Sequence, residues 1–325
     1  MLAFVLRRLI QSLFVMLAVA VIAFAMFRFV GDPVNAMLPE NASVADRAAL
    51  RAELGLDAPV ATQLVNFIAG AAQGEFGLSY RNKRPVSELI AERLPATLEL
   101  VFAAALFSLA LGVPMGVYTA LHRRGILSNV LQVISLAGIS VPTFVTGILL
   151  ILVFSVWLGW LPSFGRGETV QVGWWSTGFL TASGLQSLVL PAIMLGLFQV
   201  TLIMRLVRAE MLEVLRADFV RFARARGLTD RAVHFRHALR NALMPVITIV
   251  GLQLGGMIAF AIITETVFQW PGMGLLFIQA VNFADIPVMS AYLILVSVVF
   301  VAINLLVDLL YFAVDPRLSI SGARA

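Results

Sequence analysis

The chain has 325 residues, of which 60% are hydrophobic and 13% are charged, and its mean hydropathy is +0.95. A soluble globular domain has roughly 45–50% apolar and about 25% charged residues, so this composition excludes an ordinary soluble fold. The absence of cysteine excludes disulfides, thiolate metal sites and a cysteine nucleophile. The formal net charge of +5 does not by itself indicate nucleic acid binding, because arginine enrichment on the cytoplasmic side explains it in a membrane protein.

Six apolar runs are long enough to cross a hydrocarbon core about 30 Å thick, which takes roughly 20 helical residues. They cover residues 9–30, 96–121, 127–158, 188–207, 242–266 and 288–314. The apolar core of the first run exceeds that of a signal peptide and lacks a small-residue cleavage site, so we expect a retained helix. The third run contains Gly138 and Pro142, which interrupt it. The predicted fold class is all-α, a polytopic membrane protein with six transmembrane helices.

The placement of basic residues predicts the orientation. Most of the 23 Lys and Arg residues lie at the N-terminal tip, in the 122–124 turn, in the 205–240 loop and in the tail. Basic residues near spans favour the cytoplasmic side, so both termini are predicted to be cytoplasmic, as an even number of spans requires. We therefore divide the chain into four parts. They are an N-terminal transmembrane helix (1–30), an extracytoplasmic loop region (31–95), a five-helix transmembrane core with a cytoplasmic loop at 205–241 (96–314) and a cytoplasmic tail (315–325).

Short helices are expected in the 31–95 region. Residues 43–54 form a helix that Ser43 can cap, with Asp46 three residues later. A second helix over 60–72 ends at Gly74, and a third over 86–93 leads into the second span. Two carboxylates four residues apart, Glu88 and Glu92, favour a solvated helix face over an acid/base pair because arginine stands beside them.

Catalytic and metal-binding signals are weak throughout the chain. No glycine-rich phosphate loop is present. His234 and His237 have a spacing that could share a metal, but they stand among arginines, so we assign neither a metal site nor a catalytic residue. Trp157, Trp160, Trp174 and Trp175 are typical of an aromatic belt at the headgroup level, with substrate stacking as the alternative.

Two polar residues of the fifth span, Gln253 and Glu265, are candidates for a polar path or site inside the membrane. An ionisable residue at membrane depth is costly and commonly faces a cavity or a partner. The alternative is that Glu265 lies at the outer interface, where it is hydrated or caps the following turn. Gly251 and Gly255 form a small-xxx-small pair that predicts a close helix contact.

The basic loop that follows the fourth span predicts an amphipathic helix. Leu215, Phe219 and Phe222 share one face at a spacing of four and three residues, whereas Arg221 and Arg224 point to the other side. Gly227 can end this helix in the left-handed conformation. From these residues alone, the helix either couples to a partner protein or only anchors the loop on anionic lipid.

Several motifs in order resemble one family over nearly the whole chain. The loop carries Val220-Arg-Phe-Ala-Arg-Ala-Arg-Gly-Leu228 and then Phe235-Arg-His-Ala-Leu-Arg-Asn-Ala-Leu-Met-Pro245. Other matching stretches begin at Leu6, Gly31, Leu54, Gly77, Arg93, Glu265, Val307 and Asp315. Together they are similar to the permeases of ATP-binding-cassette importers, in the dipeptide, oligopeptide and nickel branch. Arg221 and Phe222 stand where the broader importer signature has Glu-Ala, a departure that peptide-type permeases share, whereas Ala223 and Gly227 match the signature.

The resemblance implies a type I importer permease fold in a bacterial inner membrane and a transport subunit that is not an enzyme. The implied activity is import of dipeptides or oligopeptides. The implied partners are two ATP-binding subunits, a second homologous permease, an extracytoplasmic substrate-binding protein and membrane lipid, with no nucleic acid. This chain is expected to bind no cofactor, since ATP and Mg²⁺ belong to the partner subunits. The expected coupling residues are Phe219, Arg221, Phe222, Ala223, Arg224, Ala225, Gly227 and Leu228.

Three alternatives remain open at the level of sequence. The same framework serves nickel chelates and glutathione, so the cargo is not fixed. An ion-coupled secondary transporter would show an internal repeat and intramembrane carboxylates; no repeat is obvious, and Glu265 is the clear candidate carboxylate. A membrane-embedded hydrolase or a structural anchor would need a catalytic constellation or an appended domain, and neither is visible.

Overall fold

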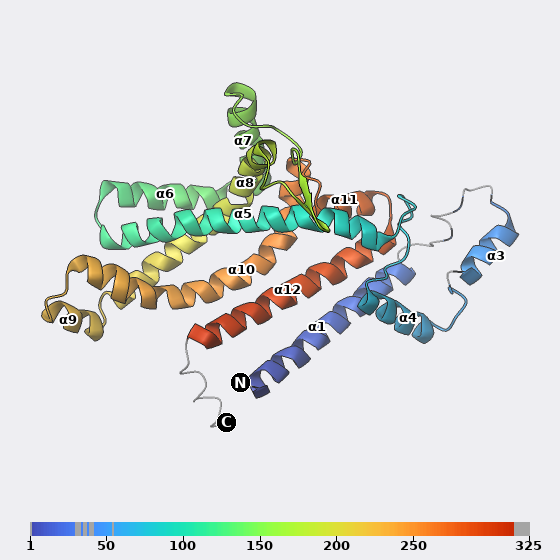
Figure 1. Ribbon diagram of the computed structural model, residues 1–325, viewed down its shortest axis with the longest axis horizontal. Helices are drawn as coiled ribbons and strands as arrows, with labels where there is room; N and C mark the ends of the chain where they lie inside the picture. The colour runs from blue at the N-terminus through green and yellow to red at the C-terminus, as the bar shows by residue number, and fades with distance from the viewer. Residues whose placement is uncertain (1, 30–33, 35–37, 39–41, 54, 315–325) are drawn as a thin grey trace. The chain divides into compact units, whose positions relative to one another are not determined.

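The computed structural model describes residues 2–29, 34, 38, 42–53 and 55–314, and its regular elements are almost all helical (Figure 1). The helices before the first strand are α1 (Leu2–Phe29), α3 (Val44–Glu53), α4 (Val60–Gln73), α5 (Val86–Leu121), α6 (Ile126–Ser140), α7 (Thr143–Leu150) and the π-helix η1 (Ile151–Trp157). A two-stranded sheet follows, made of β1 (Val170–Val172) and β2 (Trp175–Thr177). The remaining helices are α8 (Ala182–Val214), α9 (Asp218–Ala225), the π-helix η2 (Ala232–Ala238), α10 (Leu239–Val267), α11 (Met273–Asn282) and α12 (Ile286–Val314).

Five helical stretches of the described chain are long and apolar enough to cross a membrane, and each of them overlaps a predicted span. They are Arg7–Met26, Val86–Leu121, Ala182–Val214, Ala232–Val267 and Ile286–Val307. The predicted third span is broken at Val141-Pro142 into α6 and then α7 with η1, because proline has no N–H to continue the backbone ladder. The helical membrane fold is thus confirmed, whereas the number of six spans stays a prediction.

Three of the predicted spans are parts of longer helices, and the fourth span, predicted over 188–207, extends over Ala182–Val214. The expected helix at 86–93 and the span after it are one continuous helix, α5. The last span but one begins ten residues early, at Ala232, since Val233 and Ala238 continue its buried apolar face into the loop. The Gly-Asp-Pro stretch at 31–33 and the predicted tail at 315–325 lie outside the described residues.

The chain divides into two compact units, each with its own packing. Unit 1 comprises Met1–Thr97, Gln171–Ser176 and Pro271–Val301, and unit 2 comprises Leu98–Val170, Thr177–Trp270 and Ala302–Ala325. These boundaries cut through α5 and α12, so each long helix contributes to both units.

Unit 1 holds the predicted extracytoplasmic helices, and local signals explain their ends. Ser43 and Asp46 form a reciprocal capping box: the Asp46 N–H donates to Ser43 Oγ at 3.1 Å, and the Ser43 N–H donates to Asp46 Oδ2 at 3.3 Å. Helix α4 ends at Gly74, as predicted, with φ +80°. The predicted solvated face is also confirmed, because exposed Arg84 pairs with Glu88 and Glu92; the hydrogen bond to Glu92 is the main cause that raises the pKa of Arg84.

A buried carboxylate joins two distant segments of unit 1. Asp285 is 1% exposed and accepts hydrogen bonds from the Ser79 hydroxyl and from the Tyr80 N–H, the latter at 3.1 Å. The guanidinium of Arg81 lies 3.8 Å from the centre of the Phe283 ring, beside that contact. These bonds fix the loop after α4 to the turn between α11 and α12.

Unit 2 is built around α8, the most enclosed of the candidate spans. In its most apolar window 72% of the residues are buried, against 17% for the span in α1, which leaves most of the α1 surface for lipid or partner chains. Glycines bring α5 and α8 together: a Cβ at Gly112 would lie 2.8 Å from Ile203, and one at Gly116 would lie 2.6 Å from Val207. This small-xxx-small contact, which sequence reasoning missed, lets the two backbones approach closely.

The predicted role of Gly251 is confirmed in the same unit. A Cβ on this residue would lie 2.1 Å from a methyl group of Val307, so α10 and α12 also pack through a glycine. Buried residues of α5, α8 and α10, with Ala238 of η2, close one apolar cluster where the long helices meet the loop that carries α9. The loop that carries α9 is therefore attached to the packed long helices of this unit.

Candidate coupling site

Helix α9 is held to its own chain by a narrow apolar face. Val220 is fully buried and Ala223 is nearly so, and both pack against the buried Val233 of η2 and the last residue of α8, Val214. The chain reaches this position through tight turns, in which the Arg216 N–H donates to the Glu213 carbonyl and the Ala217 N–H donates to the Val214 carbonyl.

Two phenylalanines of α9 remain uncovered. Phe219 is 45% exposed and Phe222 is 64% exposed, although burying an aromatic side chain is favourable. At 100° per residue they lie on one side of the buried face, whereas Arg221 and Arg224 lie on the other. The predicted separation of an apolar ridge from a basic flank is thus confirmed for these four residues.

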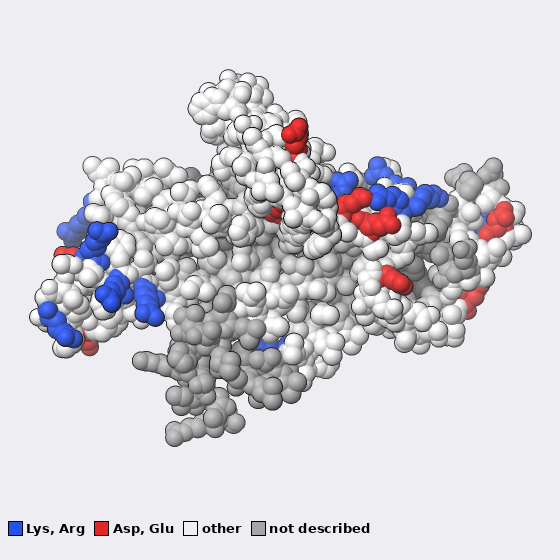
Figure 2. Space-filling view, in the orientation of Figure 1, with Lys and Arg blue, Asp and Glu red and all other residues white. Residues whose placement is uncertain are grey.

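The basic flank is paired only at the surface. Arg221 lies 3.4 Å from Asp218, and Arg224 lies 3.7 Å from Asp230, with all four side chains substantially exposed. Exposed pairs of this kind contribute about 0–1 kcal/mol, so these arginines are available to a partner. Figure 2 shows basic side chains gathered over the segment that carries α9, and all of the basic residues in that segment are arginines.

Gly227 ends α9 in the way the sequence predicts. Its φ is +77°, its N–H donates to the Arg224 carbonyl at 2.9 Å, and the Leu228 N–H donates to the Ala223 carbonyl at 3.3 Å. These two bonds and the left-handed glycine are a Schellman motif, which satisfies the last carbonyls of the helix. No atom lies within 4 Å of a Cβ built on Gly227, so the requirement for glycine here is one of backbone conformation.

The prediction that Leu215 belongs to the apolar ridge of α9 is wrong. Leu215 belongs to the end of α8, not to α9, because the chain turns before Asp218. Its side chain packs against the apolar cluster of α5, α8 and α10, and that burial holds it away from the ridge. Phe235 of η2 is a further exposed aromatic residue of this loop, at 53%, and the predicted Leu228 is exposed as well. Phe235 lies in the motif that carries the family resemblance, so its apolar side chain in a basic segment was the available signal.

The two translocation-path candidates are not brought together. Gln253 lines a small cavity of about 10 Å³ among α5, α8 and α10, beside Gln199 and Ser108. Glu265 lies three turns further along α10, is fully buried and does not line that cavity. The interpretation of Glu265 as a hydrated interfacial residue is therefore wrong, because its side chain is enclosed by protein.

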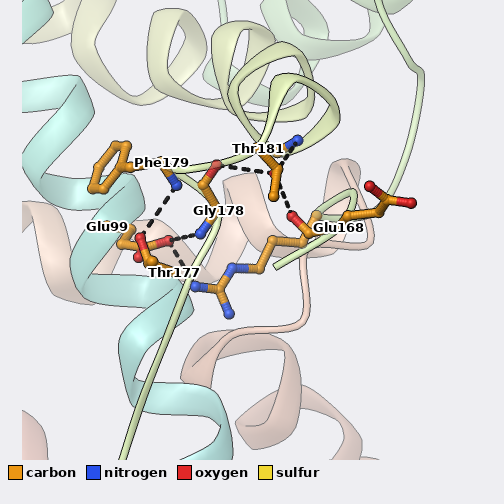
Figure 3. Close-up of polar contacts among 8 residues, drawn as sticks. Glu99, Glu168, Thr177, Gly178, Phe179 and Thr181 are labelled. Atoms are coloured by element: carbon orange, nitrogen blue, oxygen red, sulfur yellow. Dashed lines mark hydrogen bonds and ion pairs between the residues drawn. The ribbon is translucent and has the colours of Figure 1, made fainter. Parts of the chain in front are cut away.

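Sequence reasoning missed a buried ion pair on the predicted outer side. Arg166 Nη2 lies 2.6 Å from Glu99 Oε2, with the side chains 7% and 3% exposed, and the Gly178 N–H donates to the same oxygen at 3.2 Å. Figure 3 shows Glu99 on α5 in contact with the loop segment that contains Gly178. A carboxylate in the apolar second span was the signal that could have found it.

Further bonds close the same loop at its base. Thr181 caps α8 by accepting from the Gly184 N–H at 3.0 Å, and its hydroxyl donates to the Glu168 carbonyl at 2.6 Å (Figure 3). Gly167 has a φ of +72°, and a Cβ there would lie 2.6 Å from the Ser183 backbone. The entry and exit of the loop are thus fastened to α5 and α8.

The exposed tryptophans and the paired histidines support no catalytic site. Trp157, Trp160 and Trp174 are exposed, as an aromatic belt requires. His234 and His237 both lie on η2, and the described residues hold no cluster of three or more His, Cys, Asp or Glu side chains around them.

Comparison with known proteins gives the chain its relatives. The family model described as "Binding-protein-dependent transport system inner membrane component" matches residues 112–320, and a model of the N-terminal part of such components matches residues 1–101. The chain is 40% identical to the di/tripeptide transport system permease protein DppB of Pseudomonas aeruginosa, with 98% of this chain and 99% of the relative covered. It is 38% identical to the dipeptide transport system permease protein DppB of Escherichia coli, with the same coverage.

A solved structure shares the fold. The chain aligns with an inward-facing MetNI methionine ABC transporter with a TM-score of 0.56 and 20% identity, over 70% of this chain and 96% of that chain. At that identity the likeness concerns the fold alone.

Proposed function

Since this chain belongs to the family of binding-protein-dependent transport system inner membrane components, we propose that it carries short peptides through a bacterial inner membrane, driven by ATPase subunits that hold α9. The cargo is proposed from the peptide permeases to which the chain is similar over nearly its whole length. The observation that carries the coupling role is α9, a short helix anchored by one face and presenting two exposed phenylalanines beside a basic flank.

The position of α9 suits the transmission of a push or a pull. It follows α8 after a three-residue turn, and it packs on η2, which continues directly into α10. Both of these long helices are candidate spans. A displacement of α9 would therefore move the ends of two spans that are packed against each other, so closure of an ATPase dimer can bias the permease between two states.

The proposed assembly includes a second permease and partner subunits that bind ATP. No phosphate-binding loop occurs in the sequence, so ATP and Mg²⁺ would be bound by two partner ATPase subunits. A second homologous permease would complete the path, and an extracytoplasmic substrate-binding protein would deliver the peptide. Gln253 and Glu265 remain candidates for the translocation path. The candidates for coupling to the ATPase subunits remain Phe219, Arg221, Phe222, Ala223, Arg224, Ala225, Gly227 and Leu228.

Removing the two exposed rings tests the coupling role. In the co-expressed complex, Phe219→Ala/Phe222→Ala should lower the affinity for the ATPase subunits at least about 30-fold, because buried aromatic anchors of an interface commonly contribute 2 kcal/mol or more. The measurements are co-purification of the ATPase and uptake of a labelled dipeptide. Phe14→Ala, which removes a similarly exposed ring from α1, is the matched control and should leave both unchanged. Normal ATPase binding by the double variant would remove α9 from the mechanism.

A separate experiment tests the cargo. Uptake of a labelled dipeptide by cells that express the complete importer should be competed by unlabelled dipeptides and tripeptides. Glutathione and nickel chelates should not compete at the same concentration. Competition by a nickel chelate or glutathione alone would reject the peptide cargo while leaving the ATPase-coupling role intact.

A further inference from the structure

An open cavity of about 490 Å³ lies between α6 and α8, and no residue of α9 lines it. Gln132, Val133 and Ser135 line it from α6, and Arg205, Arg208 and Leu212 line it from α8. The three α8 residues follow one stripe, at a spacing of three and four residues. The Thr201 hydroxyl donates to the Ser135 carbonyl at 3.2 Å, so the two helices are joined beside the cavity.

The two arginines of this cavity have no counter-charge in the described part of the chain. Neither Arg205 nor Arg208 makes an ion pair or a side-chain hydrogen bond there, and Arg208 Nη1 is buried without a partner. Arg166, Arg221 and Arg224 each have a carboxylate within 4 Å. Arg208 is half-buried, whereas Arg205 is exposed at the mouth of the cavity. A guanidinium partly withdrawn from water is costly unless an anion replaces the water, so the position of Arg208 favours an anionic ligand.

The remaining lining residues indicate what carries the anion. Val133 is exposed toward the cavity and Leu212 is apolar, whereas Gln132 and Ser135 supply polar groups. A small inorganic anion gains nothing from the apolar part. A phospholipid places its phosphate beside the arginines and its acyl chains along Val133, which lies on the membrane side of them, whereas Leu212 lies one turn beyond Arg208 on the cytoplasmic side. Arginine suits phosphate because its planar fork donates two parallel hydrogen bonds.

The depth of the cavity agrees with a lipid of the inner leaflet. Helix α6 begins just after the basic turn at Arg123-Arg124, on the side that we predict to be cytoplasmic, and Gln132 lies about 9 Å further along it. Basic pockets between membrane helices on the cytoplasmic side are favourable sites for anionic headgroups.

We propose that the cavity between α6 and α8 binds the phosphate of an anionic phospholipid through Arg205 and Arg208. The bound lipid neutralises the half-buried guanidinium of Arg208 and the exposed one of Arg205, and it holds α6 against α8, the helix that leads into α9. This site is distinct from the ATPase contact, because Arg205 and Arg208 lie on α8, before the turn that leads to α9.

Native mass spectrometry of the complete importer tests the lipid site. The complex is released from nanodiscs of phosphatidylethanolamine with phosphatidylglycerol, and the retained lipid is counted. The Arg205→Gln/Arg208→Gln variant should retain phosphatidylglycerol about 25-fold less well, at about fivefold for each arginine. Arg123→Gln/Arg124→Gln, which removes two basic residues from the neighbouring turn, is the matched control and should retain lipid as the wild type does.

A second arm needs no variant and identifies the source of the phosphate. Wild-type complex exchanged into phosphatidylcholine receives either phosphatidylglycerol vesicles or inorganic phosphate. Saturable retention of phosphatidylglycerol that inorganic phosphate does not displace supports the proposal. Three results overturn it: no saturable retention, displacement by inorganic phosphate, or a glutamine variant that keeps the lipid but loses the second permease, which would mean that a protein fills the cavity.

Discussion

At the residue scale, two features have clear local roles: the buried ion pair of Glu99 and Arg166, and the left-handed glycine at the end of α9. Glu99 and Arg166 are enclosed together, and the loop at residues 158–181 depends on their contact. Gly227 acts through its backbone alone, since its Cβ would meet nothing. These two positions therefore lead to predictions of different kinds, one electrostatic and one conformational.

Removing the Glu99 charge should destabilise the outer loop. Glu99→Gln leaves a buried guanidinium without its carboxylate, and breaking a buried ion pair in this way costs about 3–5 kcal/mol. The measurements are thermal stability of the purified complex and the rate of proteolysis within residues 158–181. Glu168→Gln is the control, because only the backbone of Glu168 bonds within the loop. The double variant Glu99→Gln/Arg166→Met should recover part of the loss, and equal stability of wild type and Glu99→Gln would contradict the assigned role.

Substitutions at Gly227 should separate backbone conformation from size. Gly227→Asn should be tolerated better than Gly227→Val, because asparagine adopts the left-handed conformation more readily than a β-branched residue. We expect Gly227→Val to cost about 1–2 kcal/mol in the stability of the end of α9 and to lower uptake. Gly227→Arg, which adds bulk and charge, should abolish uptake and weaken ATPase association while membrane insertion persists. Dipeptide uptake and membrane-fraction blots decide the matter, and equal uptake by the asparagine and valine variants would argue against a conformational requirement.

At the element scale, the long helices of unit 2 are held by glycine contacts. Gly112, Gly116 and Gly251 each lie where a Cβ would collide with the neighbouring helix. The π-helix η2 and the turn before α9 place the exposed phenylalanines beyond these contacts. The packing of the long helices therefore also determines where α9 lies.

A methyl group at the α5–α8 contact should force the helices apart. Gly116→Ala places a Cβ 2.6 Å from Val207 and 2.8 Å from the Met204 carbonyl, and overpacking of this kind costs about 1–3 kcal/mol. Gly256→Ala on α10 meets no atom within 4 Å and serves as the control. Thermal unfolding in detergent should show a lower midpoint for the first variant alone. Comparable midpoints would mean that α5 and α8 do not pack as closely as the structure shows.

At the scale of the whole molecule, the chain is a transport subunit whose energy is expected from elsewhere. In cells with the complete importer, ATP depletion should stop dipeptide uptake, whereas collapse of the ion gradient at constant ATP should leave it. The reason is that, in the proposed mechanism, closure of a partner ATPase dimer and not an ion gradient biases the two states of the permease. Uptake that survives ATP depletion and stops with the gradient would instead support a secondary transporter.

The sequence by itself determined the class, the main spans and the end of α9. Long apolar runs must become helices in a membrane because lipid offers no partner for backbone polar groups, so their length and composition suffice. Gly227 and the capping box of Ser43 and Asp46 depend only on neighbours in sequence, and both predictions are confirmed. The family motifs likewise lie in the one-dimensional order of residues.

Only the tertiary structure decided which side chains meet. Glu99 and Arg166 form an ion pair although they are 67 residues apart. Leu215 is partly buried against the apolar cluster at the end of α8. Arg205 and Arg208 line a cavity whose other wall is α6. Periodicity assigns a residue to a helix face, but the burial of that face depends on the helix that packs against it. The exposed ridge of α9 is defined in this way: Val220 and Ala223 pack on Val233, whereas Phe219 and Phe222 stay largely exposed. Phe222 has the Arg226 guanidinium 5.7 Å from the centre of its ring.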